Sequence, residues 1–98
     1  MGEVRLPGPV KATHFEDIDA VECVPGAFEY FKAGECYPAG MIYCCPCGCG
    51  QTGSLHFRPD SPPSWDWNGN METPTLSPSV HHVGHWHGWL RDGFWVQA

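Results

Sequence analysis

The stretch Cys44-Cys45-Pro46-Cys47-Gly48-Cys49-Gly50 holds four of the six cysteines of this 98-residue chain. Free cysteine packs as a small hydrophobic residue, and no packing requirement places four thiols so close together. Neighbouring cysteines rarely meet the geometry of a disulfide either. Thiolates at short spacing, with glycine and proline to turn the backbone around an ion, are typical of a zinc site. The stretch therefore predicts a small domain organised around one bound Zn²⁺.

A second group of metal-binding side chains lies in the stretch His81-His82-Val83-Gly84-His85-Trp86-His87. Side chains two residues apart in an extended chain point to the same side, which groups alternate cysteines and alternate histidines. The candidate ligands selected in this way are Cys45, Cys47, Cys49, His85 and His87. Tetrahedral zinc takes four ligands. Two ligand sets fit: three cysteines with His87, or two cysteines with both histidines.

The remaining cysteines receive different interpretations. Cys44 points away from its neighbours in an extended run, although with Cys47 it would form an alternative Cys-x-x-Cys-Gly knuckle. Cys23 and Cys36 stand apart from the cluster and from each other, so we expect them to be buried small hydrophobic residues.

Charge and composition exclude several classes of protein. The formal net charge is −6, from 5 basic and 11 acidic residues, which argues against general binding to nucleic-acid phosphates. No apolar run is long enough for a membrane span, and the N-terminus has no apolar segment typical of a signal peptide. We therefore expect a cytoplasmic location in the host cell and no membrane partner. In that reducing compartment, cysteines bind metal more often than they form disulfides.

The pattern of turns and apolar residues predicts a mostly β fold. The 10 prolines and 12 glycines favour turns and short strands. We expect strands at 27–31, 41–43 and 54–58, with hairpin turns at Asn68-Gly69 and Asp92-Gly93. The chain forms one domain over residues 1–98, with 1–14 as an extended lead-in. It contains about five to seven short antiparallel strands in a partly open barrel or sandwich, stapled by one zinc ion.

Four motifs in order resemble a family of small proteins of unknown function from tailed phages, prophages and bacterial gene clusters. Some members carry the label "ammonia monooxygenase". The motifs lie within residues 40–97: Cys45 to Gly50, Trp65 to Gly69, Pro74-Thr75-Leu76-Ser77-Pro78-Ser79, and His87-Gly88-Trp89-Leu90-Arg91-Asp92-Gly93. The resemblance implies a zinc-binding accessory protein of the phage type. Family members commonly have a cysteine shortly before the histidine that matches His87; here Gly84, His85 and Trp86 stand there, so His85 is the natural substitute.

We expect a binding or structural role for the zinc rather than catalysis. A catalytic zinc keeps a position open for water and has a carboxylate nearby, whereas no Asp or Glu lies between residues 41 and 58. The expected function is a protein-binding module with a structural zinc and no catalytic residues. Its partner would be a host protein, a phage protein or a second copy of the chain. The alternatives are a zinc-dependent hydrolase-type enzyme and a thiol redox protein.

Overall fold

The computed structural model describes residues 8–18, 23–32, 38–58 and 63–98, and these residues contain strands but no α-helix. The strands are β1 (Val10–Lys11), β2 (Thr13–His14), β3 (Ala27–Lys32), β4 (Pro38–Cys44), β5 (Thr52–His56), β6 (Asp66–Trp67), β7 (Leu76–Ser77), β8 (Val80–His82), β9 (Trp86–Arg91) and β10 (Phe94–Gln97). The prediction of a small, mostly β domain of short strands is confirmed. No helix in the described part of the chain is long and apolar enough to cross a bilayer.

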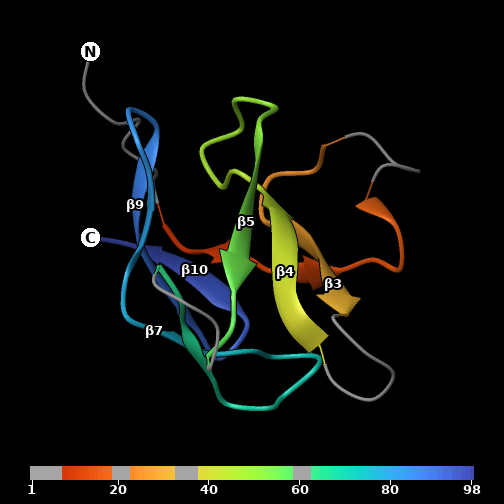
Figure 1. Cartoon of the computed structure of the whole chain (residues 1–98). Helices are drawn as coiled ribbons and strands as arrows, with labels where there is room; N and C mark the ends of the chain where they lie inside the picture. The colour runs from red at the N-terminus through yellow and green to blue at the C-terminus, as the bar shows by residue number, and fades with distance from the viewer. Residues whose placement is uncertain (1–7, 19–22, 33–37, 59–62) are drawn as a thin grey trace.

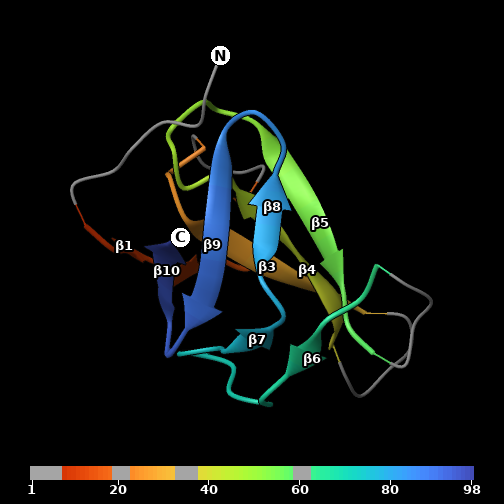
Figure 2. The same cartoon turned by 90° about the vertical axis from the view of Figure 1, so that its left-hand side faces the viewer.

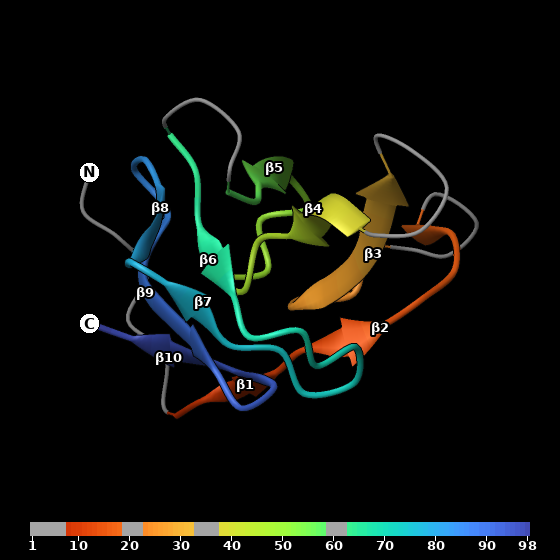
Figure 3. The same ribbon diagram turned by 60° about the horizontal axis from the view of Figure 1, so that its bottom comes forward.

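The strands form two main sheets and one small one (Figure 1). The first sheet has the order β1-β10-β9-β8, and the second has the order β2-β3-β4-β5. The β6–β7 pair lies at the end of the molecule away from the β4–β5 loop, as Figure 3 shows from below. Neighbouring strands are antiparallel except for β2 and β3, which pair in parallel. Strand β8 stands at one edge of the first sheet.

The core lies between the inward faces of the two sheets. Along β9, Trp86, Gly88 and Leu90 are buried while the residues between them are partly exposed, as expected of a sheet with one solvent face. Trp95 of β10 meets Trp86 edge to face, and its indole N–H donates to the Gly26 carbonyl oxygen at 2.9 Å. The large aromatic side chains therefore supply much of the apolar volume that so short a chain needs.

The hairpin predicted at Asp92-Gly93 is present, and the cysteine stretch closes a second hairpin. Strands β4 and β5 pair from Cys44 with Thr52 onward, so the cysteine stretch forms the loop of this hairpin. Strands β9 and β10 pair from Arg91 with Phe94. The two residues between them, Asp92 and Gly93, have φ values of 48° and 79°, the left-handed conformation that an Asp-Gly hairpin turn requires.

The hairpin predicted at Asn68-Gly69 is wrong. Strands β6 and β7 do pair, but a longer loop over residues 68–75 joins them. The Asn68 side-chain oxygen accepts hydrogen bonds from the N–H groups of Asn70 and Thr75, which holds the wider loop closed. Side-chain capping of this kind replaces the two-residue turn.

The segment expected to be an extended lead-in connects the two sheets. Its described part begins at residue 8; β1 pairs with β10 and β2 pairs with β3, with the buried Ala12 between them. Sequence patterns missed both strands because each has only two residues.

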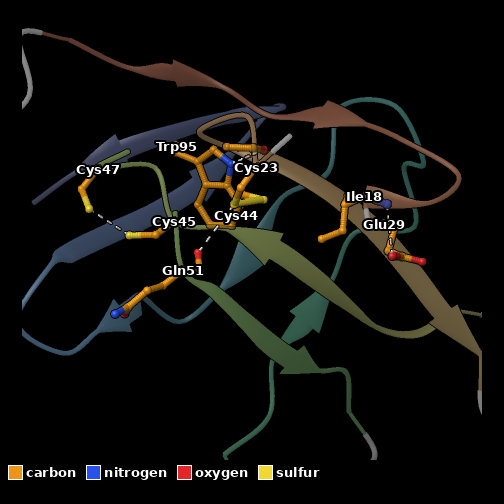
Figure 4. The surroundings of a disulfide bond; sticks show 9 residues. Ile18, Cys23, Glu29, Cys44, Cys45, Cys47, Gln51 and Trp95 are labelled. Carbon is orange, nitrogen blue, oxygen red and sulfur yellow. Dashed lines mark hydrogen bonds between the residues drawn. A yellow bond between two sulfur atoms is a disulfide. The ribbon is translucent and has the colours of Figure 1, made fainter. Parts of the chain in front are cut away.

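The interpretation of Cys23 as a buried small hydrophobic residue is wrong. Cys23 forms a disulfide with Cys44, which packs on Ile18 and Ala27 (Figure 4). The pairing depends on the approach of residues 21 positions apart, which no local pattern predicts. Cys36 lies outside the described residues.

Candidate functional site

Three thiols gather in the loop between β4 and β5. The Sγ atoms of Cys45, Cys47 and Cys49 all lie within 4.8 Å of one another. Figure 4 shows two of these side chains, Cys45 and Cys47, whose Sγ atoms are 3.3 Å apart. The Cys45 N–H donates to the Gln51 carbonyl, and the Gly48 N–H donates to the Cys45 carbonyl, so the backbone folds back tightly. Gly48 has φ of 86°, a conformation that side chains disfavour. The three thiols form a group that could hold a metal ion.

Burial and the contacts among these thiols shift their pKa values. Burial raises the pKa of the Cys45 thiol to about 12; a hydrogen bond with the Cys47 backbone acts downward, while the side chains of Cys47 and Cys49 act upward. At Cys49 slight burial also acts upward, but hydrogen bonds from the Gln51 backbone and from the other two thiols outweigh it and lower the pKa. Several thiolates can therefore coexist here when a cation compensates their charge, which is what metal binding supplies.

His85 reaches the thiol group from the turn between β8 and β9. Its Nδ1 lies 3.9 Å from Cys47 Sγ. The 4.8 Å group of three thiols does not include it, so His85 contacts the edge of the group rather than its centre. The His85 N–H donates to the His82 carbonyl, which closes the turn. Figure 2 shows this turn and the β4–β5 loop at the same end of the molecule.

A hydrogen-bonded chain connects the two halves of this region. The Tyr43 hydroxyl lies 3.1 Å from His82 Nδ1, and His82 Nε2 lies 3.1 Å from Gln51 Oε1. Burial lowers the pKa of His82, with help from His85 and His81, which favours the neutral ring. Since Gln51 Oε1 only accepts, Nε2 carries the proton and Nδ1 accepts from Tyr43. The His82 ring also meets His85 edge to face at 5.4 Å, which orients His85 toward the thiols.

A serine and a histidine form a second constellation on the outer face of the first sheet. His87 Nε2 lies 3.1 Å from Ser79 Oγ, within hydrogen-bonding distance. His87 alternates with the buried Trp86 and Gly88 along β9, and therefore points away from the core. Ser79 immediately precedes β8, and both side chains are partly buried. This is the contact that a serine nucleophile makes with its general base.

Neighbouring side chains restrain both members of this pair. The Trp65 indole N–H donates to the carbonyl oxygen of Ser79 at 3.1 Å. His81, opposite His87 across β8 and β9, places its ring 4.8 Å from the His87 ring. Both contacts limit the movement of the serine and of the imidazole.

The structure divides the five predicted ligands between two places. Cys45, Cys47, Cys49 and His85 lie together, whereas His87 contacts Ser79. Alternation of side chains along an extended chain predicts both histidines on one side, provided that residues 85–87 form one strand. In fact residues 83–85 form a turn, and β9 begins at Trp86. The glycine at position 84, between two β-forming segments, was the available signal that His85 and His87 do not share one strand. No local pattern singled out Ser79 as a functional residue.

Taken together, the fold and these constellations define a small all-β domain with a serine–histidine pair and a cysteine cluster suited to a metal ion. Residues 15–98 match the family model described as "Bacterial ubiquitination-like system serine protease (BubE)", and the chain belongs to this family. No curated protein and no solved structure matches the chain.

Proposed function

We propose that the protein is a serine hydrolase that cleaves peptide bonds, with Ser79 as nucleophile and His87 as general base. The observation that carries this proposal is the 3.1 Å separation of Ser79 Oγ and His87 Nε2. The family description, which names a serine protease of a bacterial ubiquitination-like system, agrees with this chemistry. The sequence-based expectation of a protein-binding module with a structural zinc is the second candidate below.

The proposed reaction follows from the roles of the two side chains. Ser79 Oγ attacks the carbonyl carbon of the scissile bond while its proton passes to His87 Nε2. His87 then gives that proton to the leaving amine, and an ester forms on Ser79. Water, deprotonated by His87, attacks the ester, and its proton returns to Ser79 as the acid product leaves. Trp65 and His81 act as positioning residues, because they contact the pair without reaching the bond that breaks.

A fluorophosphonate probe tests this proposal directly. An activated serine displaces fluoride and forms a stable oxygen–phosphorus bond, which mass spectrometry assigns to one residue. We expect labelling of Ser79, loss of labelling in Ser79→Ala, and unchanged labelling in Ser77→Ala, a matched control because Ser77 is exposed two residues away. Absence of a label on Ser79 in the folded protein would contradict the proposal.

A protein-binding module with a structural Zn²⁺, as the sequence predicts, is the second candidate function. What favours it is the outer face of the first sheet, where Lys11, Phe94 and Arg91 lie in one row across three strands. All three side chains are exposed, and Phe94 is 45% exposed. Two cations beside an apolar ring on a chain of net charge −6 suit a protein partner with an acidic surface. The phage-type role and the cytoplasmic location remain predictions.

Charge reversal on this face tests the second candidate. Cross-linking in lysate of the native host, followed by mass spectrometry, should identify a partner through Lys11, and Arg91→Glu should weaken its binding in a purified assay. Arg58→Glu is the matched control, because Arg58 is also exposed but already pairs with Asp66. Equal binding by both variants would exclude the face as the interface.

A further inference from the structure

We propose that Arg91 and Trp89 form a substrate subsite beside the serine–histidine pair, and that this subsite binds a carboxylate of the peptide close to the scissile bond. The carboxylate belongs either to an Asp or Glu side chain or to the free C-terminus of the peptide. This inference rests on the proposed hydrolase function and names its substrate class. It assigns Arg91 to the substrate and not to the separate partner of the second candidate function.

The subsite and the serine–histidine pair lie on the same face of the first sheet. Along β9, His87, Trp89 and Arg91 alternate with buried residues, so all three point outward. Ser79, the residue before β8, meets this row at its His87 end, where the two side chains are 3.1 Å apart. An extended peptide held at Ser79 can therefore lie along the row, because its alternate side chains have the same spacing as those of β9.

Two distances place the Arg91 guanidinium near the reacting atoms. The centroids of the His87 and Trp89 rings are 6.5 Å apart, and the central carbon of the guanidinium lies 4.6 Å from the centroid of the Trp89 ring. At about 3.3 Å per residue of extended chain, the guanidinium thus lies within about three to four residues of the imidazole. A substrate carboxylate at that separation from the scissile bond can reach it.

The contact with Trp89 prepares the guanidinium to bind a carboxylate. A guanidinium over an indole ring gains a cation–π attraction, which restrains a side chain that is otherwise flexible. Its N–H groups remain able to donate two parallel hydrogen bonds to one carboxylate. Among the described residues no carboxylate pairs with the exposed Arg91, and the neighbouring Asp92 accepts from the Thr75 hydroxyl instead. The acceptor is therefore expected from the substrate.

Charge favours an acidic ligand on this face. The chain as a whole has a net charge of −6 and repels acidic peptides in general. The four strands of the first sheet, however, contain no Asp or Glu, and they carry the cations Arg91 and Lys11. This face is the local exception in an acidic chain, so a peptide with a carboxylate fits it better than a neutral or basic peptide.

Cleavage of peptide mixtures tests the subsite. Two mixtures of random peptides, one with free and one with amidated C-termini, are digested, and the cut bonds are mapped by mass spectrometry. A side-chain ligand should appear as Asp or Glu enriched at one position within about four residues of the cut bond in both mixtures. A C-terminal ligand should appear as cuts near the free C-terminus that are lost after amidation. Cut bonds with neither pattern would overturn the subsite.

Removal of the guanidinium should abolish the preference. For the best acidic peptide, Arg91→Gln should lower kcat/KM about 10- to 100-fold, mainly through KM, because a hydrogen bond to a charged group is lost. Its preference over the matched peptide without the carboxylate should disappear. Arg58→Gln is the matched control and should keep the preference, because Arg58 is exposed but pairs with Asp66. An equal preference in Arg91→Gln and the parent would overturn the assignment.

Two further variants separate recognition from a merely structural role. Arg91→Glu should reverse the preference, toward Lys in place of the acidic residue or an amide in place of the C-terminal carboxylate; an unreversed preference would contradict direct contact. Trp89→Leu should reduce the preference about two- to fivefold, because the cation–π contact no longer orients the guanidinium. A preference that ignores Trp89→Leu would remove Trp89 from the subsite.

Fluorophosphonate labelling distinguishes failure of the subsite from failure of the hydrolase proposal. Labelling of Ser79 without a carboxylate preference, or without cleavage of any peptide, would overturn the subsite alone. Absence of both labelling and cleavage in the folded protein would refute the hydrolase function and the subsite together.

Discussion

Replacement of His87 separates catalysis from stability, because the two effects differ in magnitude. His87→Gln keeps a side chain that can hydrogen-bond to Ser79 but removes the basic nitrogen that lies 3.1 Å from Ser79 Oγ. General-base catalysis contributes about 10²–10⁴-fold to rate, or about 2.7–5.4 kcal/mol in the barrier. A neutral hydrogen bond contributes about 0.5–1.5 kcal/mol to stability. We therefore expect a large loss of reactivity with little loss of stability.

The assay compares two measurements on the same samples of the parent, His87→Gln and His87→Ala. One is the second-order rate of fluorophosphonate labelling at Ser79, and the other is the midpoint of urea unfolding. Both variants should label at least about a hundredfold more slowly. Their unfolding free energies should stay within about 1.5 kcal/mol of the parent, because the His87 side chain is only partly buried. Labelling of His87→Gln at the parent rate would refute the assignment of His87 as base.

Three further predictions address the support of the site and the core. Trp65→Phe should slow labelling of Ser79 while zinc content stays constant, because the indole N–H to the Ser79 carbonyl is lost; equal labelling rates would exclude a positioning role. Gly88→Ala should lower the unfolding midpoint sharply, because a Cβ there would lie 2.8 Å from the fully buried Trp86 ring and closer still to the β10 backbone; a normal midpoint would contradict this packing. Burial raises the pKa of Tyr30 from 10.0 to about 12, partly offset by its hydrogen bond with Trp67. The unfolded chain therefore loses this proton first, and the free energy of unfolding falls as pH rises from about 10 to 12. Burial also raises the pKa of Tyr43 to about 12, so ultraviolet titration should show late ionisation that shrinks by one tyrosine in Tyr30→Phe. An undiminished late ionisation in Tyr30→Phe would exclude burial of the Tyr30 hydroxyl.

Local features of the sequence were sufficient for the cysteine loop and for the β9–β10 hairpin. The three thiols at positions 45, 47 and 49 lie together because only one residue separates each from the next. Gly48 and Gly50 adopt positive φ, which lets the loop turn tightly. Asp92-Gly93 forms its turn because both residues tolerate positive φ. These outcomes depend on contacts between residues close in the chain, which composition and spacing encode directly.

The tertiary structure alone decided which histidine goes where. His85 and His87 are two residues apart, so alternation placed them on one side, but the chain turns at 83–85 before β9 begins. The pairing of His81 with His87 across β8 and β9 then determines that His87 meets Ser79. Likewise, Cys23 meets Cys44 only because the loop before β3 packs beside the end of β4. Contacts of this kind arise from strand register and from packing between segments, which are set by the whole fold and not by spacing along the chain.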